Sequence, residues 1–274
     1  MNKTKFISLT ASLVLATTLT LSCEDKEAKT QPAATTDEKI EADLVEAYEN
    51  IQSDRGDWDK LNAFNEKILN YTSNYPSTLT CKFDRLKNVI DIASSEDGLF
   101  RIYSWNTEQG GSMRDLENVY QYKSGDKVYV KTTNFEGGEE GSFDGSRYTQ
   151  IFTVKADSKT YYLVIDMFIG SGKVAAQSIS VFTIENNSLN SSVKLFKTKT
   201  KLLDAISVEF DPSNTNRDLI KYDPAEKKVY IPIVLEDKNG ELIVSDRYIV
   251  YQFNGQYFEH ILTQKFTSTT GDIP

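Results

Sequence analysis

The sequence has few of the residues that most often build catalytic and metal centres. Its 274 residues include two cysteines and one histidine. Zinc sites are built from several cysteine and histidine ligands, and the motifs CxxC and HExxH are absent. A Ser–His–Asp triad would have to use His260, which we interpret as an ordinary strand residue. We therefore predict no metal or other cofactor, and the sequence favours a role other than catalysis.

Positive charge is also scarce. The chain has 31 basic and 40 acidic residues, so its net charge is −9. Nucleic acids and anionic lipid head groups are bound by basic surfaces. The composition therefore argues against both classes of partner.

Long apolar runs are nearly absent. The main one spans residues 6–21, which carry no charge and follow Lys3 and Lys5. A membrane-spanning helix needs about 20 apolar residues, so this run is too short to cross a bilayer comfortably. A basic start followed by a short apolar run is typical of a secretory signal peptide. The small residue Ser22 and then Cys23 follow it directly.

Leu19, Ser22 and Cys23 resemble the lipobox of bacterial lipoproteins, although Thr20 and Leu21 depart from its commonest pattern. The resemblance implies that signal peptidase II removes residues 1–22 and that Cys23 carries fatty acyl chains such as palmitate. These chains would hold the protein on a membrane. The alternative is a plain secretory signal in which the cysteine occurs by chance.

Residues 24–27 read Glu-Asp-Lys-Glu, which resembles the surface-export signal of Bacteroidota lipoproteins. This resemblance implies a surface-exposed protein of the cell outer membrane, with a periplasm-facing position as the alternative. Residues 23–36 are then a lipidated flexible tether, because they lack large apolar side chains. With Cys23 lipidated, Cys81 has no partner for an internal disulfide, and we interpret it as a small buried apolar residue.

Two amphipathic helices are predicted after the tether. Thr35 and Glu38 form a capping-box pattern, and apolar residues recur at helical spacing from 37 to 52. A second such pattern begins at Trp58 and stops before Pro76. Residues 37–76 are therefore predicted to form a helical hairpin.

From about residue 80 the apolar pattern changes to the alternation of β-strands. We count about twelve short strands, separated by turn sequences such as Asp97-Gly98 and Asn254-Gly255. Pro232, inside one strand, indicates an edge or a bulge. Residues 77–274 are thus predicted to be a mainly β domain, an antiparallel meander that forms a sandwich, an open barrel or propeller-like blades. Its pattern is similar only to that of uncharacterised lipoproteins, and this resemblance assigns no activity to the domain.

Three loops carry polar groups that ligands use. Residues 170–173 (Gly-Ser-Gly-Lys) lack the rest of a phosphate-binding loop, so we interpret them as a turn. Residues 237–241 resemble a calcium-binding loop, but a hairpin turn explains them equally well. A glycine-rich loop at 135–145 is a weak calcium candidate, and otherwise an ordinary solvated acidic loop. Its four carboxylates are Glu136, Glu139, Glu140 and Asp144.

The loop from Trp105 to Leu116 is the candidate ligand loop. It is long for a hairpin and contains an aromatic residue, a glycine pair, Arg114 and Asp115. Aromatic surface beside an arginine and a carboxylate is typical of recognition sites. The alternative is structural: Trp105 closes the core, and Arg114 pairs with Asp115 or a nearby acid.

These observations predict a lipid-anchored cell-envelope protein that binds a glycan or protein partner. Two alternatives remain. One is a structural component of the envelope. The other is a glycoside hydrolase, which needs a pair of positioned carboxylates among the 40 acidic residues.

Overall fold

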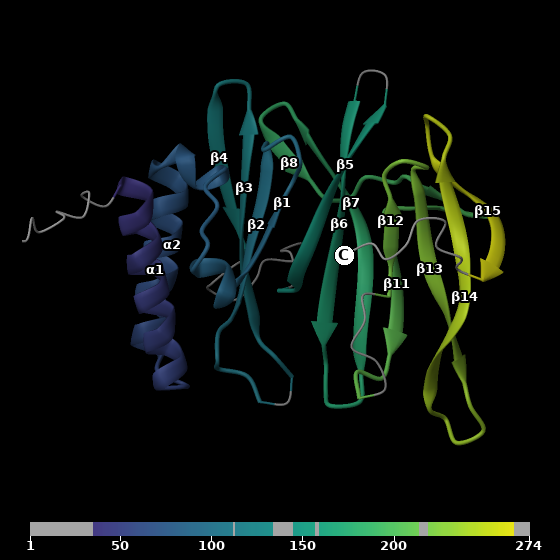
Figure 1. Cartoon of the computed structure of the whole chain (residues 1–274), viewed down its shortest axis with the longest axis horizontal. Helices are drawn as coiled ribbons and strands as arrows, with labels where there is room; N and C mark the ends of the chain where they lie inside the picture. The colour runs from purple at the N-terminus through teal and green to yellow at the C-terminus, as the bar shows by residue number, and fades with distance from the viewer. Residues whose placement is uncertain (1–34, 112, 134–144, 157–158, 214–218, 266–274) are drawn as a thin grey trace, which may run out of the picture. The chain divides into compact units, whose positions relative to one another are not determined.

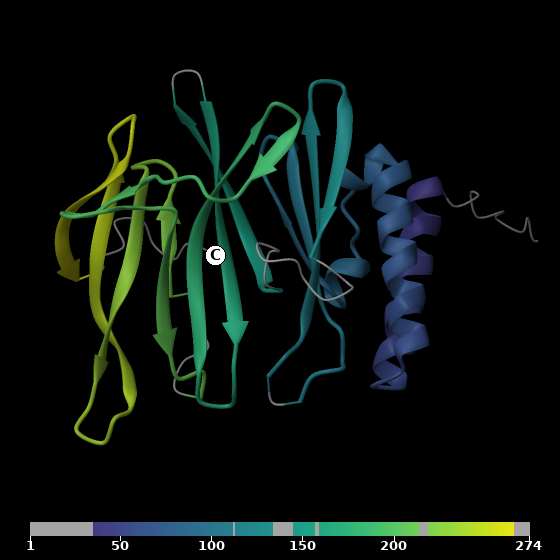
Figure 2. The same cartoon turned by 180° about the vertical axis from the view of Figure 1, so that it is seen from behind.

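The computed structural model describes residues 35–111, 113–133, 145–156, 159–213 and 219–265. Figures 1 and 2 show a helix pair followed by three β-sheets side by side, four layers in all. The fold is mainly β, with two α-helices near the N-terminal end of the described residues. Neither of these helices is long and apolar enough to cross a membrane.

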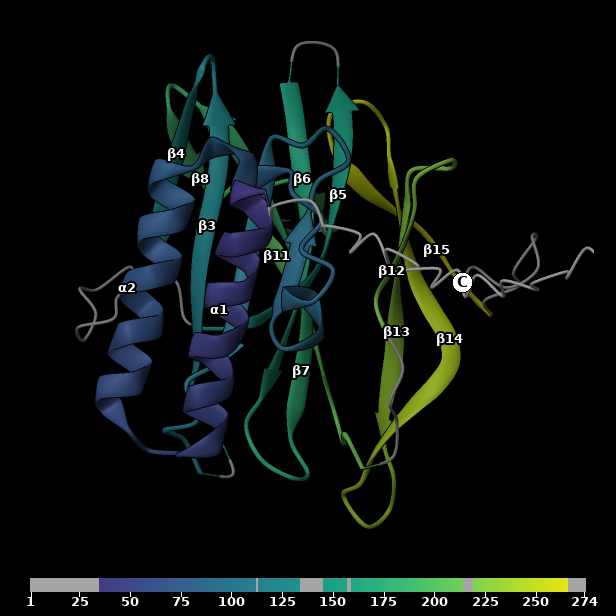
Figure 3. The same cartoon turned by 60° about the vertical axis from the view of Figure 1, so that its left-hand side comes forward.

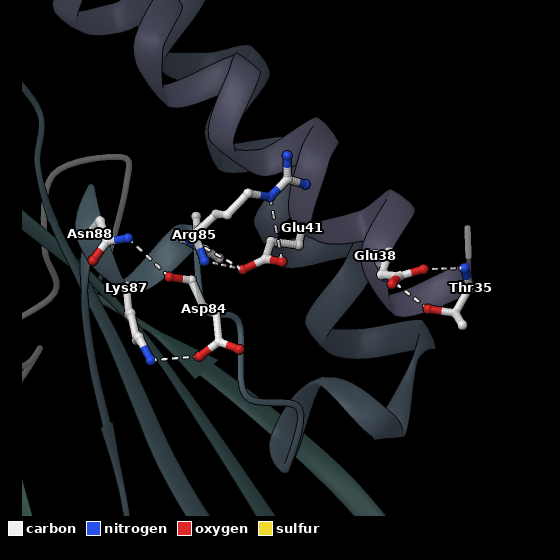
Figure 4. A network of polar contacts seen from close by, with 8 residues as sticks. Thr35, Glu38, Glu41, Asp84, Arg85, Lys87 and Asn88 are labelled. Carbon is white, nitrogen blue, oxygen red and sulfur yellow. Dashed lines mark hydrogen bonds and ion pairs between the residues drawn. The ribbon is translucent and has the colours of Figure 1, made fainter. Parts of the chain in front are cut away.

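The two predicted helices are confirmed as α1 (Thr36–Ser53) and α2 (Trp58–Asn74). α1 begins at the predicted capping box. The Glu38 carboxylate accepts from the Thr35 N–H at 2.6 Å, and the Thr35 hydroxyl accepts from the Glu38 N–H at 3.2 Å (Figure 4). Asp57 caps α2, and α2 ends two residues before Pro76. The hairpin therefore arises from local signals at each helix end.

A carboxylate fixes the chain between the helices and the first strand. Two short 3₁₀-helices occupy this stretch, η1 (Pro76–Leu79) and η2 (Leu86–Asn88). The Glu41 carboxylate of α1 accepts from the backbone N–H groups of Arg85 at 2.6 Å and Leu86 at 3.1 Å (Figure 4). It thus supplies a cap to η2, which has none of its own.

Fifteen strands are described, and they form three sheets. The first sheet has the order β1 (Asp91–Ser94), β2 (Phe100–Asn106), β3 (Leu116–Ser124), β4 (Lys127–Thr132). The second has the order β11 (Ala205–Phe210), β7 (Ala175–Glu185), β6 (Lys159–Ile169), β5 (Arg147–Ala156), with β8 (Ser188–Asn190) on β7. The third has the order β10 (Leu202–Leu203), β9 (Phe196–Lys197), β15 (Phe258–Lys265), β14 (Leu242–Phe253), β13 (Lys228–Glu236), β12 (Lys221–Asp223).

The three largest apolar cores of the described residues lie between the four layers. The helices lie over the first sheet, as Figure 3 shows from the helix side. They pack on it through residues such as Phe64, Tyr103 and Trp105. The other two cores join the first sheet to the second and the second to the third. Strand β6 supplies both, because Tyr162 and Val164 face one core while Leu163 faces the other. A strand buried on both faces explains the continuous apolar run in this part of the sequence.

The predicted antiparallel character is confirmed for every strand pairing that the structure describes except β9 with β15, which run parallel. Residues 170–173 form the β6–β7 turn, and Asp237 caps the β13–β14 turn through the N–H groups of Asn239 and Glu241. The register shift beside Pro232 is the predicted bulge. The sheets stack face to face, as in a sandwich with a third sheet added.

Candidate functional site

A cavity of about 620 Å³ lies where the helices, the first sheet and the start of β5 meet. Its walls come from the C-terminal end of α1 and the turn after it, residues 89–91, the end of β2, the β2–β3 loop and Arg147. Volumes of this size, roughly 300–1,000 Å³, are usual for small-molecule sites. The candidate ligand loop predicted from the sequence therefore forms one wall of a cavity.

Three of the chain's seven arginines line this cavity, in a protein whose net charge is −9. Arg147 pairs with Asp91, and Arg55 pairs with Glu108. Arg114 makes no ion pair with another described residue. Three cations against two lining carboxylates leave a net positive charge in the cavity wall.

The Arg147–Asp91 pair is bidentate, with nitrogen–oxygen distances of 2.7 and 2.9 Å. It joins the start of β5 in the second sheet to the start of β1 in the first. Two parallel bonds from a guanidinium to a carboxylate fix both groups in one plane. This side of the cavity is therefore held rigidly by the contact between two sheets.

Glu108 is held in an unusual backbone conformation. Its φ is +58°, in the left-handed region that costs a residue with a side chain about 1–2 kcal/mol. Its carboxylate receives the Arg55 guanidinium at 3.1 Å and the Asn106 amide N–H at 2.9 Å. Its side chain is 13% exposed, so these contacts hold a carboxylate inside the wall.

The ends of the β2–β3 loop are tied together. The Thr107 N–H donates to the Asp115 carbonyl at 2.9 Å, and the Thr107 hydroxyl donates to the Asp115 carboxylate at 3.1 Å. A side chain at Gly110 would meet the Met113 carbonyl at 2.4 Å, so the loop requires glycine there. The Arg114 N–H also donates to the Ile169 carbonyl of β6. The loop thus presents Arg114 from a fixed base.

The Tyr48 side chain of α1 lies close enough to Glu108, Asp91 and Arg114 for their charges to affect its pKa. Burial, reinforced by the negative charges of Glu108 and Asp91, raises the pKa of its hydroxyl to about 12, while Arg114 acts in the opposite direction. The hydroxyl donates to the Asn106 carbonyl at 3.1 Å. The phenol is therefore neutral at physiological pH and within electrostatic reach of both carboxylates and of Arg114.

The three residues predicted for the ligand loop take different positions. Trp105 is 1% exposed and packs edge-on against Phe64, so most of its ring belongs to the core. The Asp115 carboxylate bonds Thr107 rather than Arg114. Arg114 is exposed and lines the cavity. Trp105 thus packs in the core and also borders the cavity, and Arg114 is the exposed candidate ligand group.

The other sequence candidates do not add to this site. Cys23 and the calcium candidates Glu136, Glu139, Glu140 and Asp144 lie outside the described residues. His260 is an exposed residue of β15, as predicted, and Cys81 is half-buried against the helix–sheet core. Among the residues that the structure does describe, no group of three or more His, Cys, Asp or Glu side chains is placed to hold a metal ion.

Two carboxyl groups have strongly raised pKa values, but they do not share a site. Burial raises the pKa of Glu117 and of Asp166 to about 7 in each case. Glu117 of β3 faces α2, beside Asn65 and Trp105. Asp166 of β6 accepts a hydrogen bond from Ser146, which Asn118 binds on the other face of β3. The pair that glycoside hydrolysis needs is therefore not formed by these two groups.

Sequence reasoning missed Tyr48, Arg55, Asp91 and Arg147, which come from three separate segments without a recognisable motif. It singled out the loop that holds Glu108 but gave this residue no role. Only the Arg55-Gly56 turn and the glycine pair at 110–111 mark places where the chain reverses. No local pattern indicates that these reversals share one cavity.

Comparison of the chain with protein-family models, with curated proteins and with solved structures finds no match in any of the three. The candidate site therefore stands on its own geometry and charge.

Proposed function

We propose that this protein is a lipid-anchored binding module of the cell envelope, and that its ligand occupies the cavity between α1, the β2–β3 loop and Arg147. One observation carries the proposal. Arg114 presents its charge to a cavity of about 620 Å³ and makes no ion pair with another described residue. An arginine at a rigid cavity wall is suited to fixing a ligand's orientation.

The anchoring part of the proposal rests on the sequence. Residues 6–21 are an uncharged apolar run, and Cys23 follows in the pattern of a lipobox. Two or more acyl chains hold a protein on a membrane, whereas one chain holds it only marginally. The acidic residues after Cys23 support export to the outer surface of the outer membrane.

Ligand binding is tested by retention of the full chain, in detergent micelles, on immobilised host and bacterial polysaccharides. We expect specific retention that is lost in the variant Gly111→Trp. Gly111 lines the cavity, has no atom within 4 Å of an added Cβ and has no positive φ, so a large side chain there fills space without straining the backbone. Gly172→Trp is the matched control, because Gly172 has equal space in the β6–β7 turn. Retention that both variants keep would place binding elsewhere, and no retention at all would favour the structural role.

Anchoring is tested by growing cells with a labelled palmitate analogue. We expect label on the wild-type protein and none on Cys23→Ser, with Cys81→Ser labelled like the wild type. Proteolysis of intact cells then separates a surface position from a periplasmic one. Equal labelling of Cys23→Ser would contradict the anchor.

A further inference from the structure

We infer that this cavity binds an acidic sugar, a ligand that joins a carboxylate to several hydroxyl groups, and that Arg114 receives the carboxylate. The inference rests on the proposed binding role of the cavity and names the chemical class of the ligand. It follows from the charge and the hydrogen-bonding capacity of the groups that line the wall.

The charge of the wall selects a carboxylate. Two of the three arginines already hold carboxylates of the chain itself, Asp91 on Arg147 and Glu108 on Arg55. Both pairs show that a planar carboxylate fits a guanidinium in this wall. Arg114 is the third arginine, and no described residue supplies its carboxylate. A ligand that carries a carboxylate would give Arg114 the same kind of partner that Arg55 and Arg147 already have.

The neutral groups of the wall select hydroxyls. Gln52 lines the cavity, is exposed, and its side-chain amide makes no hydrogen bond with another described residue. The same holds for the backbone N–H groups of Gly110 and Gly111 in the loop. An amide and two N–H groups offer donors and an acceptor beside Arg114, and hydroxyl groups use both. A purely apolar acid would make no use of these groups.

Glu108 limits the affinity for such a ligand. Its carboxylate is fixed inside the wall and competes with the ligand for the positive field of the arginines. Like charges repel, so this carboxylate opposes the binding of an anionic ligand in the same wall. Removal of the Glu108 charge should therefore tighten the binding of an acid and leave a neutral sugar unaffected.

The first experiment is calorimetric titration of the full chain in detergent with glucuronate, glucose, acetate and inorganic phosphate. We expect glucuronate to bind about tenfold or more tightly than glucose, because a hydrogen bond between charged groups contributes more than one between neutral groups. Acetate, which lacks the hydroxyls, and phosphate, which lacks the carboxylate, should bind more weakly than glucuronate. Polygalacturonate tests whether the acid is recognised free or within a polymer, and binding of either form supports the class.

Two charge variants test the assignment of residues. Arg114→Gln should lower the affinity for glucuronate about tenfold or more, while Arg247→Gln, an exposed arginine of β14, should leave it unchanged. Glu108→Gln should raise the affinity for glucuronate about threefold or more and leave glucose unchanged. Its matched control is Glu226→Gln, which removes a carboxylate from an exposed ion pair with Lys228 outside the cavity.

The outcomes separate this inference from the proposed function. Equal binding of glucose and glucuronate, or a preference for phosphate that depends on Arg114, would overturn the acidic-sugar class. If the chain retains a neutral polysaccharide and the variant Gly111→Trp loses this retention, the acidic-sugar class is wrong, but the proposed binding role stands. If the variant Gly111→Trp weakens the binding of none of these ligands, both the acidic-sugar class and the proposed binding role are wrong.

Discussion

At the scale of single residues, half-buried carboxyl groups make the stability of this protein depend on pH. Burial raises the pKa of Glu117 from its usual 4.5 to about 7, with the nearby charge of Asp115 acting in the same direction. Between these two values the folded chain holds a proton that the unfolded chain has released. The free energy of unfolding therefore falls as pH rises from about 4.5 to 7, and the full cost of the buried charge remains above pH 7.

The variant Glu117→Gln removes this cost. At pH 8 we expect its melting temperature to exceed that of the wild type by a few degrees, since 1 kcal/mol corresponds to about 2–4 °C in a chain of this size. At pH 5 the two proteins should melt together, because the wild-type carboxyl is then protonated. Differential scanning calorimetry at both pH values measures this, with the exposed Glu96→Gln as control. An equal shift at pH 5 and pH 8 would mean that packing, and not charge, is responsible.

The two tryptophans allow a direct test of burial. Trp105 is 1% exposed and packs on Phe64, whereas Trp58 is 60% exposed at the start of α2. Trp105→Ala should cost about 3–5 kcal/mol of stability, because it leaves a cavity between the helices and the first sheet. Trp58→Ala should cost much less. Urea unfolding measures both, and a small loss for Trp105→Ala would contradict its place in the core.

At the scale of elements, each helix end is set by side chains close in sequence. Thr35→Ala removes the hydroxyl that accepts from the Glu38 N–H, so it should cost about 1 kcal/mol. Thr36→Ala, one residue further on, is the control, because Thr36 is exposed and is not the capping residue. Urea unfolding followed by circular dichroism compares them. Equal losses would show that the capping box does not act in solution.

The strands show how burial on one or both faces appears in sequence. β6 is apolar at successive positions because it lies between two cores, while β13 carries a bulge beside Pro232, which cannot donate a hydrogen bond to a neighbouring strand. Both features are visible in the sequence. The pairing of β9 with β15 is not, because sixty residues lie between the two strands.

At the scale of the whole molecule, the helix pair covers an apolar face of the first sheet. Removal of residues 35–75 would expose Tyr103, Trp105 and Val119, which are all fully or nearly fully buried. We expect the shortened chain to aggregate and to bind the dye ANS, since exposed apolar patches of this kind promote association. Size-exclusion chromatography and dye fluorescence measure this against the intact chain. A soluble monomer that unfolds cooperatively would show that the sheets fold without the helices.

The sequence alone was enough for the features that depend on neighbours along the chain. The capping box at Thr35, the helical spacing before Pro76 and the alternating strands after residue 80 are local, so their interactions can be inferred from spacing. It also singled out the loop from Trp105 to Leu116, because that loop is long and rich in polar groups. The lipid anchor at Cys23 is a prediction from the same kind of local pattern.

Only the tertiary structure decided what that loop does with its side chains. Trp105 lies in the core because α2 covers the sheet, and Asp115 is taken by Thr107 across the base of the loop. Arg55, Asp91 and Arg147 join Arg114 only because the helices and two sheets stack at one place. Contacts between layers depend on the burial of apolar faces far apart in sequence, and no local pattern records which polar groups those faces bring together.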